Sequence, residues 1–147
     1  MAFHMLVIDY LRDSLKAQAP RHLHVRREMT VTLSARQRPE PDIMIVDAAA
    51  STGLEQTTYE PQDVLLAIEV VSPDSIIRDR KRKPVLYADA GIPHFWRVEN
   101  VDGRAVVYVF ELDPATGQYA PTGIYHDTLD LTLPFPITLH LAEATAP

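Results

Sequence analysis

Apolar residues at the start of the chain recur at three- and four-residue spacing. From Phe3 to Leu15 they form one helical stripe, and Pro20 would end the helix. From residue 23 to residue 34 apolar and polar side chains alternate, which predicts a half-buried strand. The chain is therefore expected to begin with a helix followed by a strand.

Two apolar runs come next. DIMIV, starting at Asp42, predicts a short buried strand, and VLLAIEVV, at residues 64–71, is the most apolar run and predicts a central strand. Residues 47–63 are mostly polar and predict a long loop between the two. A carboxylate, Glu69, lies late in the second run, where burial of a charge is costly.

The remaining pattern adds one helix and several strands. SPDS at residues 72–75 can start a helix, Pro84 predicts a break before a helix near 83–90, and Gly91 stands where a C-terminal cap is expected. Strands are predicted at 94–99, 104–112, 118–125 and 137–141, the middle two forming a hairpin around DPATG. The order predicts an α/β protein with one mixed sheet.

Composition narrows the class. A length of 147 residues suits a single domain over 1–147, and the absence of cysteine excludes disulfides and thiolate metal sites. No apolar stretch approaches a membrane span of about 18–20 residues, and the N-terminus has no basic leader. We expect a cytoplasmic protein.

Charge is unevenly distributed within a net charge of −6. Of 14 Lys and Arg residues, five lie in 21–38 and five in 78–83, whereas 39–77 holds eight acids and no base. Basic segments around an acidic middle fit a metal site between phosphate-contacting arms, and they also fit ordinary solvated surface.

Asp42 opens one predicted strand and Glu69 lies late in the next. If these strands are neighbours, their carboxylates converge at one end of the sheet, and with a backbone carbonyl they form an oxygen site suited to Mg²⁺. A cation would also make a buried Glu69 tolerable. The alternative is that Glu69 snorkels from a strand end or pairs with an arginine.

Four motifs occur together between residues 39 and 100. Pro41-Asp42 is followed by EVVSP from Glu69, by the spaced residues Asp79, Lys83 and Tyr87, and by GIPHFW from Gly91. In combination they resemble the PD-(D/E)XK, or restriction-endonuclease-like, superfamily, and within it the Uma-two family of endonucleases.

This resemblance implies a restriction-endonuclease-like core with a central mixed sheet, flanking helices and a C-terminal hairpin. It also implies a metal-dependent endonuclease acting on nucleic acid, DNA in particular. Asp42 and Glu69 would hold Mg²⁺, or Mn²⁺ in its place, with the Val70 carbonyl as a third ligand. Because one small domain presents one active site, cutting both strands would call for a homodimer.

The sequence departs from the superfamily pattern at Val71, where a lysine is expected. In related sequences a lysine on the following helix takes this role, and Lys83 occupies that position. Asp79 could pair with Lys83 on a continuous helix, but Pro84 disfavours helical geometry at Lys83 and keeps Lys81 as a rival. Phosphate contacts could come from Arg78, Arg80 and Arg82.

A second departure is the absence of the acidic N-terminal hairpin that family members often carry. Glu28 and Glu40 are the possible substitutes for its glutamate. The competing interpretation is a catalytically degenerate nuclease fold that serves as a binding or interaction module. Val71, the acidic net charge and the missing hairpin favour it.

Overall fold

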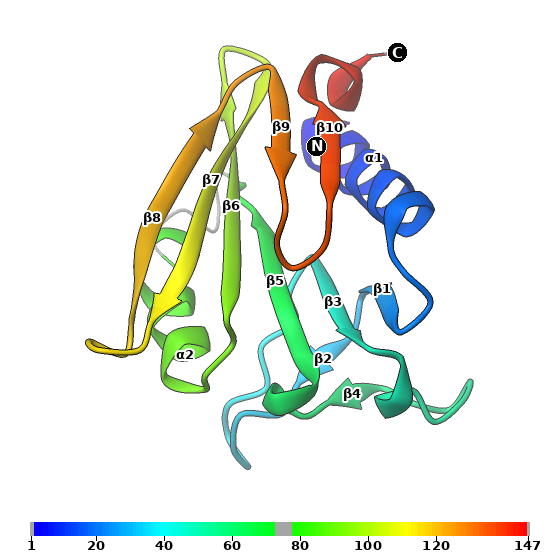
Figure 1. The fold of residues 1–147 in the computed structure, drawn as a ribbon, viewed down its shortest axis with the longest axis vertical. Helices are drawn as coiled ribbons and strands as arrows, with labels where there is room; N and C mark the ends of the chain where they lie inside the picture. Colours follow the sequence, from blue (N-terminus) through cyan, green and yellow to red (C-terminus); the bar gives the residue numbers. More distant parts are fainter. Residues whose placement is uncertain (1, 73–77, 147) are drawn as a thin grey trace.

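The structure is a computed structural model that describes residues 2–72 and 78–146, with only the backbone of Arg78 and Asp79. Six strands form one mixed sheet in the order β1-β3-β5-β6-β7-β8 (Figure 1). All neighbours are antiparallel except β5 and β6. These strands are β1 (Leu23–Arg27), β3 (Ile43–Asp47), β5 (Val64–Val70), β6 (His94–Val101), β7 (Arg104–Asp113) and β8 (Gln118–Tyr125).

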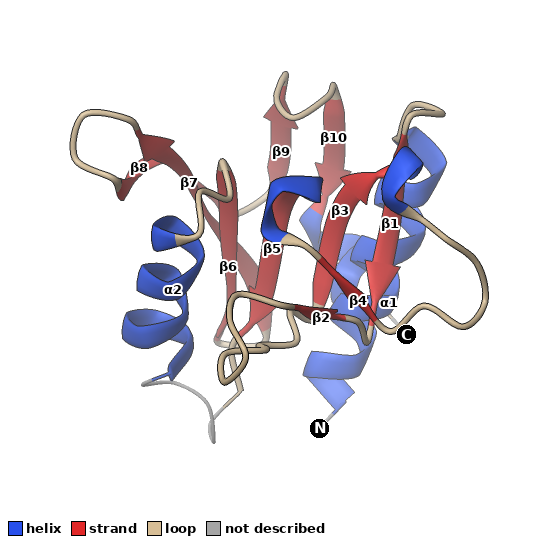
Figure 2. Ribbon diagram, turned by 90° about the horizontal axis from the view of Figure 1, so that it is seen from below, coloured by secondary structure: helices blue, strands red, loops and turns tan. Residues whose placement is uncertain are grey.

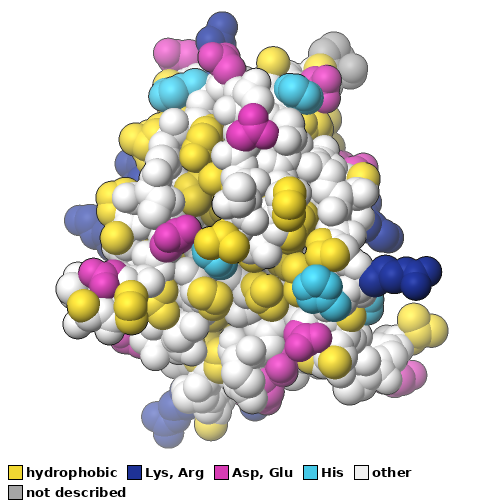
Figure 3. All heavy atoms as spheres, viewed as in Figure 1, with side chains coloured by type: hydrophobic (Ala, Val, Ile, Leu, Met, Phe, Trp, Pro, Cys, Tyr) yellow, Lys and Arg dark blue, Asp and Glu magenta, His cyan; other side chains and the backbone are white. Residues whose placement is uncertain are grey.

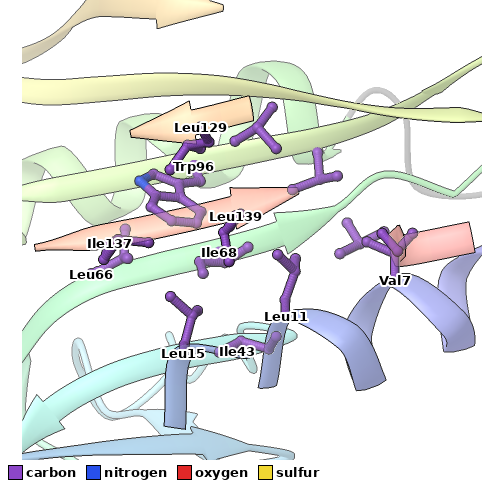
Figure 4. Close-up of a cluster of buried hydrophobic side chains, with 14 of the residues drawn as sticks. Val7, Leu11, Leu15, Ile43, Leu66, Ile68, Trp96, Leu129, Ile137 and Leu139 are labelled. Carbon is purple, nitrogen blue, oxygen red and sulfur yellow. The ribbon is translucent and has the colours of Figure 1, made fainter. Parts of the chain in front are cut away.

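One face of the sheet is covered by α1 (Ala2–Gln18) together with the hairpin of β9 (Thr128–Leu131) and β10 (Ile137–His140) and the short turn η4 (Leu141–Thr145). The stripe predicted on the first helix supplies the buried residues of α1, and Trp96 contributes from the sheet (Figure 4). Because strand side chains alternate between faces, Ile68 and Val70 point into this core. Glu69 therefore points to the other face.

The opposite face carries α2 (Lys83–Asp89), preceded by the π-helical turn η3 (Arg78–Arg82) (Figure 2). A smaller core there surrounds Phe95 and Tyr87 and includes residues of the parallel pair β2 (Thr30–Val31) and β4 (Thr58–Tyr59). The predicted sheet with helices on its two faces is confirmed. None of the described helices is long and apolar enough to cross a membrane.

The predicted C-terminal cap of α2 is present. Gly91 has φ +81°, and its N–H donates to Ala88 O at 3.0 Å, while the N–H of Ile92 donates to Tyr87 O at 3.1 Å. This pair of bonds is a Schellman motif, in which a left-handed residue ends the helix and satisfies its last carbonyls. The cap fixes the end of α2, and Ile92 is buried beneath it.

The single strand predicted over 23–34 is wrong. Glu28 has φ +60°, a left-handed conformation that interrupts the extended chain. Before it, β1 buries Leu23 and Val25 in the α1-side core; after it, β2 buries Val31 in the α2-side core and pairs with β4. The alternating pattern was real on each side of the break, but the chain changes faces at Glu28.

The sequence predicted the remaining elements only in part. The long loop over 47–63 contains β4 and two 3-10 turns, η1 (Ala48–Ala50) and η2 (Pro61–Asp63). The sequence analysis missed β9, which pairs with the predicted last strand, β10. The predicted helix start at SPDS falls on residues 73–75, which lie outside the described residues. The hairpin around DPATG is confirmed as β7 and β8.

Candidate active site

Asp42 and Glu69 come together at one end of β3 and β5. The last antiparallel pair of these strands is Ile43 with Ile68, so the next position along each strand is Asp42 opposite Glu69. A hydrogen bond joins the strands here, because Asp42 Oδ2 accepts the backbone N–H of Val70 at 2.7 Å. The two carboxylates that the sequence singled out therefore lie at the same end of the sheet, on neighbouring central strands.

Glu69 is only 1% exposed, so its carboxylate does not snorkel to solvent. Its Oε1 accepts from Lys83 Nζ at 3.1 Å, and its Oε2 accepts from the Tyr87 hydroxyl at 2.6 Å. Lys83 and Tyr87 are one turn apart on α2, which places them on the same side of the helix. An ammonium and a hydroxyl from α2 thus compensate the buried carboxylate, where the sequence analysis had considered an arginine.

The lysine that contacts Glu69 is Lys83. Val71, at the position where the superfamily has its lysine, is a buried apolar residue. Val71 is 8% exposed and donates its N–H to Val98 O at 2.8 Å, so it extends the β5–β6 pairing. Pro84 lies within the first turn of α2, where a proline is tolerated because the N–H that it lacks would have no helical partner. Pro84 was expected to disfavour helical geometry at Lys83, but Lys83 is the first residue of α2 and directly follows the π-helical turn.

Lys81, the alternative to Lys83, is exposed and lines a cavity between α2 and the β7–β8 hairpin. The predicted pairing of Asp79 with Lys83 and the predicted phosphate contact of Arg78 fall on side chains outside the described residues. Arg82 is exposed on the same turn.

The two glutamates considered as substitutes for the family's N-terminal acid lie on the outer side of Asp42. Glu28 and Glu40 line a small cavity of about 180 Å³ together with His4 and Asp42. The His4 ring is close to Asp42, with 3.5 Å between Nε2 and Oδ1. Both glutamates are exposed, and Glu28 pairs with Arg27 at 3.3 Å.

Sequence reasoning missed an ion cluster on β6 beside Glu69. Glu99, 8% exposed, accepts from Arg97 Nε at 2.6 Å and from the Arg80 guanidinium. Arg97 is the cross-strand partner of Glu69 in the parallel β5–β6 pair. Arg80, for which a phosphate contact was expected, forms this ion pair while its side chain is 46% exposed, and the phosphate contact stays a prediction. The available signal was the alternation of the charged residues Arg97 and Glu99 with apolar residues in HFWRVE.

Asp42 and Glu69 present carboxylate oxygens at this end of the sheet. Among the described residues no three His, Cys, Asp or Glu side chains come together in a way that could hold a metal ion. A pair of carboxylates suits Mg²⁺, which keeps several waters and is bound through one or two carboxylates plus substrate phosphate. Carboxylate oxygens of Asp42 and Glu69 are the type of ligand that such an ion prefers.

A solved structure shares this fold. It is described as "a putative nuclease belonging to DUF820" from Anabaena variabilis ATCC 29413, and it superposes with a TM-score of 0.69 at 14% identity, over 97% of this chain and 80% of that one. NucC from P. aeruginosa ATCC27853, in its cAAA-bound form, gives 0.46 at 11% identity over 78% and 69% of the two chains. Apo NucC from E. coli MS115-1 gives 0.47 at 10% identity over 82% and 78%. These last two scores are too low to support an argument.

The sequence as a whole matches one protein family. No curated protein matches it. The profile of the family Uma2, described as "Putative restriction endonuclease", matches residues 2–144, which is nearly the whole chain. The resemblance inferred from the four motifs is thereby confirmed, and the chain belongs to the Uma2 family of restriction-endonuclease-like proteins.

Proposed function

We propose that this protein is a divalent-metal-dependent endonuclease that hydrolyses phosphodiester bonds of nucleic acid, and of DNA in particular. The observation that carries the proposal is Glu69, a carboxylate 1% exposed on a central strand, with Asp42 beside it and the Lys83 ammonium on its Oε1. Burial of a charge in this manner is costly, and it is a common arrangement where the charge serves chemistry.

The metal ion would be held by Asp42 and Glu69, with the Val70 carbonyl as a third ligand. Mg²⁺ is the proposed ion and Mn²⁺ its substitute, since both prefer oxygen ligands. When bound, such an ion lowers the pKa of a water molecule and offsets the charge that develops on the phosphate.

The chain's own residues position this chemistry. The Val70 N–H fixes Asp42 Oδ2, and the Tyr87 hydroxyl fixes Glu69 Oε2, so both carboxylates are held in one orientation. Lys83 bonds the other oxygen of Glu69, and its side chain is 22% exposed, so the ammonium lies between the buried carboxylate and solvent. From there it can orient the attacking water and stabilise negative charge on the phosphate oxygens.

The test is cleavage by the full chain of supercoiled plasmid, single-stranded DNA and RNA, with Mg²⁺, Mn²⁺ or EDTA. Glu69→Gln keeps the shape of the side chain but removes its charge, and we expect it to abolish cleavage. Lys83→Met should reduce the rate by about 100-fold or more. Glu60→Gln is the matched control, because Glu60 is exposed and its side chain caps nothing.

Two outcomes would contradict the proposal. Cleavage that survives Glu69→Gln would come from another site or another protein. No cleavage of any substrate with either ion would favour the non-catalytic binding module.

We further propose a homodimer, because double-strand cleavage requires two such sites. A protein that sediments as a monomer and still cuts both strands of a duplex in one encounter would exclude the homodimer.

A further inference from the structure

A second cavity lies on the same sheet face as Glu69. It has a volume of about 350 Å³, within the size range of small-molecule sites, and it opens between α2 and the β7–β8 hairpin. The lining residues used below are Arg80, Lys81, Arg97, Phe110 and Tyr119. The mechanism proposed above uses none of them.

The charge lining this cavity is opposite in sign to that of the whole chain. Arg80, Lys81 and Arg97 contribute three cations, and Asp89 is the one acid in the lining. Glu99 binds both arginines from the side, which leaves the exposed Lys81 as a cation available to a ligand. Lys and Arg side chains lie mainly at the margins of the opposite face (Figure 3). In a protein of net charge −6, this local excess of cations favours an anionic ligand.

Two aromatic side chains, Phe110 and Tyr119, line the cavity and are held by other residues. The Tyr119 ring stacks on Phe95 at a centroid distance of 5.4 Å, and its hydroxyl donates to Ile92 O at 2.7 Å. Phe110 packs against Phe95 from β7, at 5.7 Å between ring centroids. The Arg97 guanidinium lies 5.5 Å from the Phe110 ring centroid. Aromatic faces next to cations are what stacked nucleobases and their phosphates require.

The cavity also adjoins the proposed reaction site. Arg97 is the cross-strand partner of Glu69, and Pro84, which lines the cavity, directly follows Lys83. A polyanionic strand that places one phosphate at Lys83 would therefore have a neighbouring nucleotide close to Lys81.

We propose that this cavity binds a nucleoside phosphate as an unpaired nucleotide, with its base on Phe110 and Tyr119 and its phosphate at Lys81. The chemistry admits two sources, a free mononucleotide or a nucleotide within a strand. Placement of the strand relative to Glu69 rests on the proposed nuclease function, whereas binding in the cavity does not.

The experiment measures binding in EDTA, so that it does not depend on cleavage. The probes are a fluorescent single strand of about 12 nucleotides, its duplex, and dAMP as a competitor, with the full chain and fluorescence anisotropy as readout. Lys81→Ala removes the cation, and Phe110→Leu removes the aromatic face but keeps an apolar side chain in the core. Lys16→Ala is the matched control, because Lys16 is exposed on α1, on the opposite side of the sheet.

We expect Lys81→Ala and Phe110→Leu each to weaken single-strand binding by about tenfold, and Lys16→Ala to leave it unchanged. Lys81→Ala should also lower the salt dependence of binding by about one phosphate contact, whereas Phe110→Leu should not. A Phe110→Leu variant with an unchanged circular dichroism spectrum and melting temperature separates lost binding from lost folding.

The dAMP competition distinguishes a free mononucleotide from a nucleotide within a strand. Competition by dAMP that Phe110→Leu abolishes would assign the cavity to free nucleotides, and strand binding without dAMP competition would assign it to a strand. The proposal is overturned if both variants bind like Lys16→Ala, or if the duplex binds as tightly as the single strand with the same losses. If the protein binds the single strand in this way but cleaves no substrate, the cavity proposal is supported and the nuclease proposal is contradicted.

Discussion

Removal of the Lys83 charge should destabilise the protein through Glu69. Lys83→Met keeps a chain of similar length and deletes the ammonium that lies 3.1 Å from Glu69 Oε1. The carboxylate is 1% exposed and would stay buried with the Tyr87 hydroxyl but without that cation. A buried charge that loses its partner keeps its desolvation penalty, so the folded state loses free energy.

The magnitude follows from the burial of the two partners. Breaking a fully buried ion pair from one side costs about 3–5 kcal/mol, and an exposed pair contributes about 0–1 kcal/mol. Lys83 is 22% exposed while Glu69 is buried, so we expect Lys83→Met to lower the free energy of unfolding by about 2 kcal/mol. In a Glu69→Gln background no charge is left unpaired, and the same change should cost about 0.5 kcal/mol or less.

The assay is a double-mutant cycle by urea denaturation in EDTA, followed by circular dichroism. The four proteins are the wild type, the two single variants and the double variant, so that the coupling of the two side chains is measured directly. If Lys83→Met costs the same in both backgrounds to within about 0.5 kcal/mol, Lys83 does not compensate the Glu69 charge. The electrostatic reading of the site would then be refuted.

Three further outcomes are expected. Tyr87→Phe removes the 2.6 Å bond to Glu69 and should lower the free energy of unfolding by about 1–3 kcal/mol in urea titrations, because a buried acceptor loses its donor. Gly91→Ala puts a side chain at φ +81° and should cost about 1 kcal/mol, seen as a lower melting temperature. Burial lowers the pKa of His94 below its ordinary 6.5, against an opposing effect of Glu111. Below pH 6.5 the unfolded state therefore binds more protons, so stability should fall on acidification, and His94→Gln should flatten that dependence as the pH falls through about 6.5.

Local patterns predicted the elements that position the site. The apolar stripe between Phe3 and Leu15 became α1, and the apolar run ending at Val71 became the central strand β5. Gly91 capped α2 as expected, because a left-handed cap depends only on the residues around it. The motif positions Asp42 and Glu69 proved to be cross-strand neighbours; their catalytic roles stay predictions.

Features that depend on distant contacts were not readable. Nothing in the local sequence shows that Glu28 adopts a left-handed conformation, so the change of face between β1 and β2 was missed. Arg97 and Glu99 became part of the site through the parallel register of β6 with β5, which is set by tertiary packing. Tyr87 appeared in the family motif, but only the docking of α2 shows that its hydroxyl reaches Glu69.

The site combines two separate supports. Asp42 and Glu69 belong to the rigid sheet, but the cation comes from α2, which reaches the sheet through a chain segment after Val71. The distance between the Glu69 carboxylate and the Lys83 ammonium is therefore set by the docking of α2 on the sheet. Strand geometry alone does not set it. Substitutions beneath α2 that leave every charged residue untouched can widen or narrow that gap. In the proposed nuclease, helix–sheet packing alone would therefore tune the rate of the reaction, whereas in a site whose lysine shares the strand of its acid the strand fixes this spacing.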